Sequence, residues 1–234
     1  MKSNFLFHFF GLLFPARCPV CDEVTQRRSR LCEACEKTVE RIEEPCPGCG
    51  REKSECMCSR SDFKLQLVAP FVYKDDLALA IRRFKFNDEL ILSEYFAKEM
   101  CAAVSKEYPE KKVDSVTCVP LTKKKRNKRG YNQSELLAKD CANLLGTVFE
   151  NALIKSRDTT DQHELKAKER LKNLKDAFEV NKSVEIKGKT VLLCDDIKTT
   201  GATLYECRKA LIKAGAKDVC CVCIAVVPEK LIND

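Results

Sequence analysis

The sequence has no apolar run long enough to cross a bilayer, which takes about 20 residues. Its only long apolar stretch is "FLFHFFGLLF", Phe5 to Phe14, in a chain of 234 residues. That stretch has the length of a signal-peptide core, but the "ARCPVC" that follows it lacks a convincing cleavage site. We therefore expect a cytoplasmic protein that is not an integral membrane protein. Residues 5–14 then pack on the protein as a helix or arm, or touch the inner face of the cell membrane.

Motifs of several common enzyme classes are also missing. The chain contains neither G-x-x-x-x-G-K-[ST] nor G-x-G-x-x-G, so nucleoside triphosphate binding and dinucleotide binding lack their motifs. The "HELK" at His163 is not the H-E-x-x-H zinc motif, and no Ser-His-Asp constellation is visible. The catalytic residues, if the protein is an enzyme, are therefore unknown at this point.

Cysteine, by contrast, is abundant: the chain has sixteen, without the secretory signal that would favour disulfides. Eight of them form two sets, "CPVC" with "CEAC" and then "CPGC" with "CMC". Zinc prefers a tetrahedral shell of four thiolates, which paired cysteines at this spacing supply. The predicted zinc ligands are Cys18, Cys21, Cys32 and Cys35 in the first set, and Cys46, Cys49, Cys56 and Cys58 in the second. We expect one or two structural ions.

The pairing of these cysteines with the ions stays open, because the two sets could bind consecutively or interleave. A redox role is disfavoured, since no strand–motif–helix context surrounds the C-x-x-C pairs. A segment with so few large apolar side chains cannot build much of a core, so we expect the metal to supply its folding energy. Residues 1–61 are thus predicted to be an N-terminal arm with a cysteine-rich double zinc ribbon, and residues 62–234 a second domain.

Beyond residue 62 the pattern changes to alternating strands and helices. We predict a strand or hairpin at Lys64–Tyr73, strands at Asp114–Leu121, Lys189–Asp195 and Asp218–Val227, and helices at Asp76–Phe86, Glu89–Tyr108, Ser134–Gly146 (with Ser134 as the N-cap) and Ala202–Gly215. Unbroken apolar strands between helices indicate an α/β fold, a parallel sheet flanked by helices. Five cysteines in these strands are predicted core residues: Cys118, Cys194, Cys220, Cys221 and Cys223. Such sheets bind ligands beyond the carboxyl ends of their strands.

The stretch "TVLLCDDIKTTGATL", Thr190 to Leu204, ends a predicted strand with two adjacent acids, Asp195 and Asp196. The loop after them carries threonines around Gly201 and leads into a helix N-terminus, which suits a phosphate. Carboxylates accept hydrogen bonds from ribose hydroxyls, and one of them can help to retain a hydrated magnesium ion. The residues therefore indicate a sugar phosphate as the ligand.

This stretch resembles the phosphoribosyl-pyrophosphate (PRPP) motif of type I phosphoribosyltransferases: an apolar strand, two acids, then T-T-G-A-T. The resemblance implies that Asp195 and Asp196 hold the ribose hydroxyls of PRPP, bound together with magnesium. It also implies that Lys198, Thr199, Thr200, Gly201, Ala202 and Thr203 wrap the 5′-phosphate, and that Val119, Pro120 and Leu121 face the pyrophosphate.

Three further stretches, "RRFKFND", "KRGYNQSELLAK" and "RDTTDQHELKAKERLKNLKDAF", resemble the ComF competence proteins. The order of parts does too, because cysteine knuckles precede a phosphoribosyltransferase-like domain. This resemblance covers nearly the whole chain and implies a role in natural transformation, in which the protein handles incoming single-stranded DNA. Two features depart from the pattern: the closing "CMC", and the short end after Val227, which leaves little chain for a hood over an acceptor base.

The net charge of +7, from 42 basic and 35 acidic residues, permits a polyanionic partner without demanding one. The run "KKKRNKRG" is either a solvated loop or a contact for pyrophosphate or the DNA backbone. Its nucleic-acid candidates are Lys123, Lys124, Lys125, Arg126, Lys128 and Arg129, followed by Tyr131, which could stack a base. In the charged segment 157–178, which suits a loop closing over PRPP, the candidate contacts are Arg157, Gln162 and Arg170.

Three functions stay open at this point. In the favoured one the protein is a DNA-uptake factor that binds PRPP and single-stranded DNA. In the second it is an active phosphoribosyltransferase whose acceptor is unknown, because nothing in the sequence specifies a purine, a pyrimidine or an amine. In the third it is a PRPP-sensing adaptor that docks a competence helicase or a membrane channel.

Overall fold

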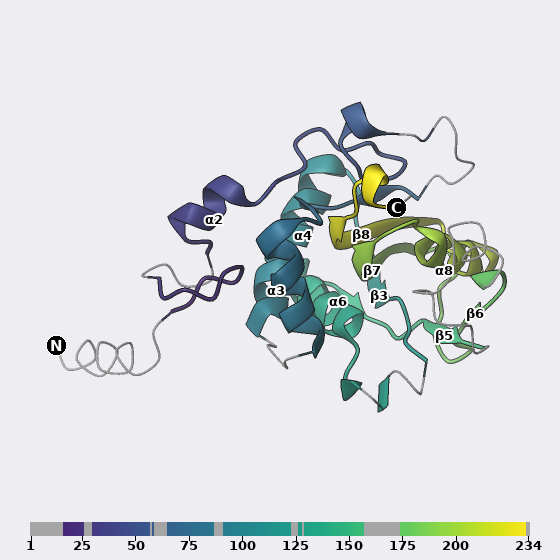
Figure 1. Ribbon diagram of the computed structural model, residues 1–234. Helices are drawn as coiled ribbons and strands as arrows, with labels where there is room; N and C mark the ends of the chain where they lie inside the picture. Colours follow the sequence, from purple (N-terminus) through teal and green to yellow (C-terminus); the bar gives the residue numbers. More distant parts are fainter. Residues whose placement is uncertain are drawn as a thin grey trace.

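The computed structural model describes residues 16–25, 30–56, 58, 65–86, 91–122, 126–127, 129–156 and 174–232 (Figure 1). Within these ranges no helix is both long enough and apolar enough to span a membrane. The apolar stretch Phe5–Phe14 and the predicted domain boundary between residues 61 and 62 lie outside the described residues.

A parallel sheet forms the centre of the molecule, in the strand order β1-β8-β7-β3-β4, with β2 also paired to β8. The strands are β1 (Leu67–Val68), β2 (Phe71–Val72), β3 (Ser115–Cys118), β4 (Val148–Phe149), β7 (Thr190–Lys198) and β8 (Asp218–Val226). The predicted α/β fold class is confirmed. The five strand cysteines predicted as core residues are all buried.

Two short strands replace the single strand or hairpin that the sequence predicts at Lys64–Tyr73. Both β1 and β2 run parallel to β8, so they do not pair with each other as a hairpin would. Pro70 lies between them, and proline has no N–H to donate to a strand ladder. The chain therefore joins the edge of the sheet in two steps, with Pro70 between them.

Helices cover both faces of the sheet, as Figure 1 shows: α3, α4 and α6 on one side, and α8 on the other. They span α3 (Asp75–Phe86), α4 (Ile91–Glu107), α6 (Gln133–Leu144) and α8 (Ala202–Lys213), and an antiparallel pair, β5 (Leu153–Lys155) and β6 (Phe178–Val180), lies beside α8. Alternate residues of β7 point to opposite faces. Leu192 and Cys194 therefore belong to the core under α4 and α6, whereas Val191 and Leu193 belong to the core under α8.

Two local predictions are wrong at the ends of elements. The N-cap of α6 is Asn132, whose side chain accepts from the backbone N–H of Ser134, so Ser134 lies inside the helix and is not its cap. Strand β7 also continues past its predicted end at Asp195 and runs to Lys198. The reason is the long partner strand, because β8 keeps parallel register with β7 as far as the pair Lys198 and Val226.

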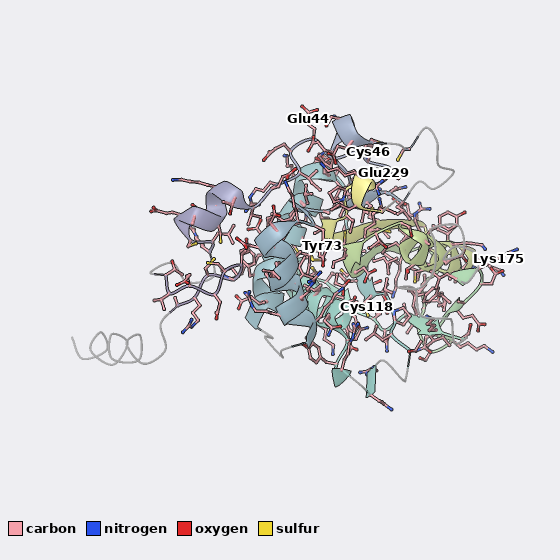
Figure 2. All side chains as sticks on the ribbon, viewed as in Figure 1. Glu44, Cys46, Tyr73, Cys118, Lys175 and Glu229 are labelled. Carbon is pink, nitrogen blue, oxygen red and sulfur yellow. The ribbon has the colours of Figure 1, made fainter. Side chains whose placement is uncertain are left out.

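The cysteine-rich segment packs on the sheet domain through two separate contacts. Its first part, which contains helix α2 (Glu33–Thr38), places Val20 and Leu31 in the core under α3 and α4. Arg83 of α3 donates hydrogen bonds to the carbonyls of Pro19 and Val20. The second part, around the 3₁₀ turn η1 (Lys53–Glu55), contacts the end of the chain, where Figure 2 labels Cys46 and Glu229.

Candidate functional site

Two clusters of four cysteines lie in the N-terminal segment, and their members are those that the sequence predicts. Within each cluster the four Sγ atoms lie within 4.8 Å of one another. The clusters use consecutive cysteines, Cys18 to Cys35 in one and Cys46 to Cys58 in the other. The interleaved pairing that the sequence left open is therefore not the one adopted.

The thiol geometry of both clusters suits zinc. Four sulfurs at about 2.3 Å from a tetrahedral ion are separated by about 3.8 Å. The Sγ–Sγ distances include 3.7 Å for Cys21–Cys32, 3.7 Å for Cys46–Cys58 and 3.8 Å for Cys49–Cys56, while Cys46 and Cys56 lie closer, at 3.1 Å. Four thiolates complete such a shell and leave no position for a substrate, so these are structural centres. The unusual "CMC" pair takes part in its cluster like the others.

A cavity of about 470 Å³ opens at the carboxyl ends of the central strands. Its lining includes the residue that directly follows, or ends, each of four strands: Tyr73, Val119, Lys198 and Val227. This is the edge at which parallel α/β sheets bind their ligands. The structure places around this cavity every residue that the PRPP resemblance singles out except Thr200: Asp195, Asp196, Lys198, Thr199, Gly201, Ala202, Thr203, Val119, Pro120 and Leu121.

The two acids have different partners. Asp195 accepts hydrogen bonds at Oδ1 from the hydroxyl of Ser134 and from the backbone N–H of Asp196, each at 2.9 Å. Asp196 forms an ion pair with the Lys85 ammonium, with 2.9 Å between Oδ2 and Nζ. Burial, and then the negative charge of Asp196, raise the pKa of Asp195 to about 7. Near neutral pH Asp195 is therefore only partly ionised.

Lys198 is a buried cation at the same edge. It is 3% exposed, and its ammonium forms no hydrogen bond or ion pair with any residue in the described ranges. Burial, and then the positive charge of Arg51, lower the pKa of Lys198. An ammonium without a counter-ion is costly to bury, so a lysine bordering this cavity favours an anionic ligand.

The loop between β7 and α8 turns at Gly201, which has a φ of 85° and directly precedes α8. A side chain there would strain the backbone, and its Cβ would lie 2.8 Å from a methyl of Leu65. Thr200 supports the turn by accepting at Oγ1 from the N–H of Ala202, at 3.4 Å. The N-terminus of α8 thus opens into the cavity, where its backbone N–H groups favour an anion.

Several lining residues were not predicted from the sequence. They are Lys85, Asn132, Gln133, Ser134, Lys155, Phe178, Leu231 and Ile232, with Tyr73, Thr122, Ile197, Leu204 and Val227. The only signal for Lys85 was its place in "RRFKFND", which carried a family resemblance but no role. Leu231 and Ile232 come from the 3₁₀ turn η4 (Glu229–Leu231) and the residue after it. The short end of the chain therefore does contribute to the cavity wall.

The basic run is described only at Arg126, Arg129 and their neighbours; Lys123, Lys124, Lys125 and Lys128 lie outside the described residues. Arg126 pairs with Glu135 at 3.3 Å, and Arg129 donates to Gln133 at 3.2 Å. The hydroxyl of Tyr131 donates to the carbonyl of Phe84 at 2.6 Å. The loop candidates Arg157, Gln162 and Arg170 also lie outside the described residues.

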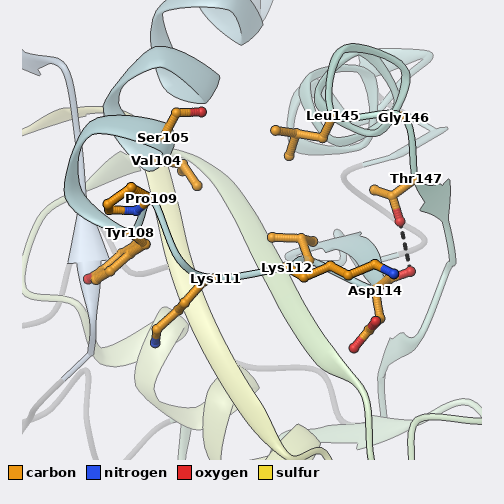
Figure 3. Close-up of a pocket in the computed structure, with 11 residues that line it drawn as sticks. Val104, Ser105, Tyr108, Pro109, Lys111, Lys112, Asp114, Leu145, Gly146 and Thr147 are labelled. Carbon is orange, nitrogen blue, oxygen red and sulfur yellow. Dashed lines mark hydrogen bonds between the residues drawn. The ribbon is translucent and has the colours of Figure 1, made fainter.

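A second cavity, of about 550 Å³, lies at the opposite edge of the sheet, between the end of α4 and the end of α6 (Figure 3). Thr147 donates there to the carbonyl of Asp114, at 2.7 Å. Lys111 is already bound, with its Nζ 2.6 Å from Asp218 and 2.8 Å from Gln66. This cavity is the weaker candidate for a ligand site, because Lys111 already has partners and because the cavity lies at the amino ends of the strands.

The chain matches two family models: Double zinc ribbon domain over residues 9–61, and Phosphoribosyl transferase domain over residues 131–234. It is 29% identical over 223 residues to Competence protein F of Haemophilus influenzae, covering 88% of this chain and 95% of the relative. The chain therefore carries both domains, and along most of its length it is similar to proteins named for competence. Competence protein ComFC of Bacillus subtilis is 29% identical, with 85% of this chain and 89% of the relative covered.

DNA utilization protein YhgH of Salmonella typhimurium is a further relative, 28% identical over 88% of this chain and 89% of its own length. Among solved structures, adenine phosphoribosyltransferase from Saccharomyces cerevisiae is 17% identical, with a TM-score of 0.41 over 67% of this chain and 76% of that one. The similarity to these relatives extends over both domains, the double zinc ribbon and the phosphoribosyl transferase domain.

Proposed function

We propose that this protein is a member of the ComF family, that it binds PRPP with magnesium in the cavity at the carboxyl edge of its sheet, and that it handles single-stranded DNA during DNA uptake. Relatives named for competence and for DNA utilization support the cellular role. The single observation that supports PRPP as the ligand is the arrangement of Asp195, Asp196 and the buried Lys198 around one cavity. Carboxylates for hydroxyls and a buried cation for a phosphate are what a phosphorylated sugar requires.

Each part of the cavity has a task in this proposal. Asp195 and Asp196 accept hydrogen bonds from the two ribose hydroxyls. The N–H groups at the start of α8, with Thr199 and Thr203, donate to the 5′-phosphate, and Lys198 neutralises part of its charge. Magnesium, when bound with PRPP, would supply positive charge to the pyrophosphate, and a carboxylate of the acid pair could help to hold it.

Single-stranded DNA is the finer part of the proposal. Arg126 is exposed beside the cavity-lining Arg129, and four lysines of the same run adjoin them in the sequence. Basic side chains of this kind bind a phosphate backbone without sequence preference and lose affinity as salt rises. DNA that follows this run would approach the mouth of the PRPP cavity.

Transfer of the phosphoribosyl group is the second candidate function, favoured by one observation. Apolar Leu231, which is 54% exposed, and Ile232 both line the cavity, so part of its wall can receive an apolar acceptor group. Phosphoribosyl transfer needs mainly electrostatic stabilisation of the departing pyrophosphate. The absence of a Ser-His-Asp constellation from the sequence is therefore no obstacle to it.

Calorimetric titration of the zinc-loaded protein with PRPP and magnesium tests the ligand. We expect binding by the wild type and its loss in Asp195→Asn/Asp196→Asn, which keeps side-chain size and removes both charges. The matched control is Asp218→Asn, an acid at the opposite end of the sheet, which should bind normally. Absence of binding by the wild type would refute the proposal.

Two further assays separate the finer claims. Single-stranded DNA binding should weaken as salt rises and on reversal of the charges of residues 123–129, and no binding at low salt would refute the DNA claim. Release of pyrophosphate on incubation with candidate acceptors would establish transfer.

A further inference from the structure

The second cysteine cluster, Cys46 to Cys58, is connected by packing to the loop around Gly201, to which the proposed function assigns the 5′-phosphate. The connection runs through Leu65, whose backbone N–H donates to the carbonyl of Gly48, inside the "CPGC" knuckle, at 2.7 Å. A Cβ at Gly201 would come within 2.8 Å of a Leu65 methyl, so loop and knuckle share one packed residue. Leu65 is 2% exposed, which makes this contact part of the core.

Arg51, two residues after the knuckle, makes the second connection. It is 6% exposed, and its Nε donates to the carbonyl of Val227 at 3.2 Å. Its guanidinium also forms an ion pair with Glu229 of the terminal turn η4. The N–H of Val227 in turn donates to the carbonyl of Lys198 at 2.9 Å. One arginine therefore joins the knuckle to the end of β8, to the terminal turn and, through Val227, to Lys198.

The same arginine is fixed on the side of the cysteine cluster. The carbonyl of Arg51 accepts from the N–H of Cys46 at 2.7 Å, and the N–H of Gly50 donates to the carbonyl of Cys46 at 2.8 Å. Gly50 has a φ of 72°, and a Cβ there would lie 2.9 Å from Leu67 of β1. The backbone at Gly50 thus packs closely against Leu67 of β1.

We propose that Arg51 is a positioning residue for the ligand cavity: it braces the phosphate loop and the terminal turn against the second cysteine cluster. A planar guanidinium suits this role because it can bind a carbonyl and a carboxylate in fixed directions at once, which a lysine ammonium does less well. Arg51 does not line the cavity itself, so it acts through Val227 and Lys198 and not by touching the ligand.

Hydrogen exchange of the zinc-loaded protein without PRPP tests the brace directly. In Arg51→Ala we expect faster exchange of residues 198–204 and 227–232 and unchanged exchange of β3. Arg51→Lys should lie between the two proteins, and it also serves if Arg51→Ala does not fold. Lys53→Ala, which removes an exposed cation of the same ribbon paired with Glu44, is the matched control and should exchange like the wild type.

Zinc content and PRPP affinity complete the test. The effect on PRPP binding rests on the proposed function, so titration with PRPP and magnesium is a separate experiment. In it, Arg51→Ala should raise the Kd for PRPP about tenfold and leave the zinc content unchanged. Unaltered exchange in both Arg51 variants would overturn the brace, as would loss of zinc from Arg51→Ala, which would assign the residue to the metal centre. Failure of the wild type to bind PRPP would refute the proposed function alone, since the exchange result still decides the role of Arg51.

Discussion

The ammonium of Lys85 lies 2.9 Å from the carboxylate of Asp196, and the side chains are 18% and 15% exposed. Lys85 is at the end of α3 and Asp196 is in β7, so the pair joins two residues that are 111 positions apart in the sequence. The carbonyl of Lys85 also accepts from Gln133 of α6 at 3.0 Å. The positive charge that pairs with Asp196 therefore comes from Lys85 of α3, which lies outside the motif at Thr190–Leu204.

Replacing Lys85 should destabilise the protein, and the size of this loss should depend on the charge of Asp196. Lys85→Met leaves Asp196 half-buried beside Asp195 without its cation, at a cost of roughly 1–3 kcal/mol in the free energy of unfolding. We expect Asp196→Asn to recover most of this loss when the two changes are combined. Urea unfolding at pH 7.5 measures it. Lys98→Met, which breaks an exposed pair with Glu94, is the control and should cost much less.

The raised pKa of Asp195 should appear in the pH dependence of stability. Folding raises the pKa of this carboxyl from near 4 to about 7, so its favourable contribution is full below pH 4 and is lost as the pH rises to 7. Asp195→Asn cannot ionise, yet its Oδ1 can still accept from Ser134. The variant should therefore gain stability relative to the wild type between pH 5 and pH 8. Parallel stability curves for the two proteins would contradict the raised pKa.

Metal analysis should find two zinc ions per chain. Cys18→Ser and Cys46→Ser remove a ligand from different clusters, so each variant should retain about one ion. Cys223→Ser alters a buried thiol of β8 outside both clusters and should retain two ions. Elemental analysis after dialysis, with protein quantified in parallel, distinguishes these outcomes. Loss of both ions from one single variant would indicate a shared centre instead.

Gly201 and Gly146 form a matched pair for the phosphate loop. Both have positive φ, 85° and 64°, so alanine costs about 1–2 kcal/mol of backbone strain at either position. Only at Gly201 does the added Cβ meet a neighbour, Leu65, whereas nothing lies within 4 Å at Gly146. Gly201→Ala should therefore lose more stability and should lose PRPP affinity, while Gly146→Ala keeps its affinity. Equal effects on both measurements would argue against the tight loop packing.

Asn132 and Ser134 should separate helix capping from support of the acid pair. Asn132→Ala removes the N-cap of α6 and should cost about 1 kcal/mol of stability at any pH between 5 and 8. Ser134→Ala removes the hydroxyl that donates to Asp195, so its cost should grow as Asp195 ionises towards pH 8. Unfolding free energies at three pH values test the difference. A cost for Ser134→Ala that does not vary with pH would contradict it.

Local pattern was sufficient for much of this protein. The two cysteine sets are predicted by their spacing alone, because a C-x-x-C turn brings its two thiols together whatever surrounds it. Apolar periodicity likewise predicts α3, α4, α6 and α8, and the unbroken apolar strands predict a parallel sheet. The acid pair and the threonine loop around Gly201 are consecutive in the sequence, so their shared role as ligand groups is a prediction from the sequence too.

Only the tertiary structure decided what supports those groups. Lys85 and Ser134 contact the two acids, and Arg51 contacts Val227, from other elements and over sequence separations at which no periodicity connects them. Strand β7 extends beyond its predicted end at Asp195 because β8 pairs with it as far as Val226. Spacing along the chain determines which side chains lie close together within one turn or loop. Long-range packing determines which charged groups, hydrogen-bond partners and cavity walls surround each of those side chains.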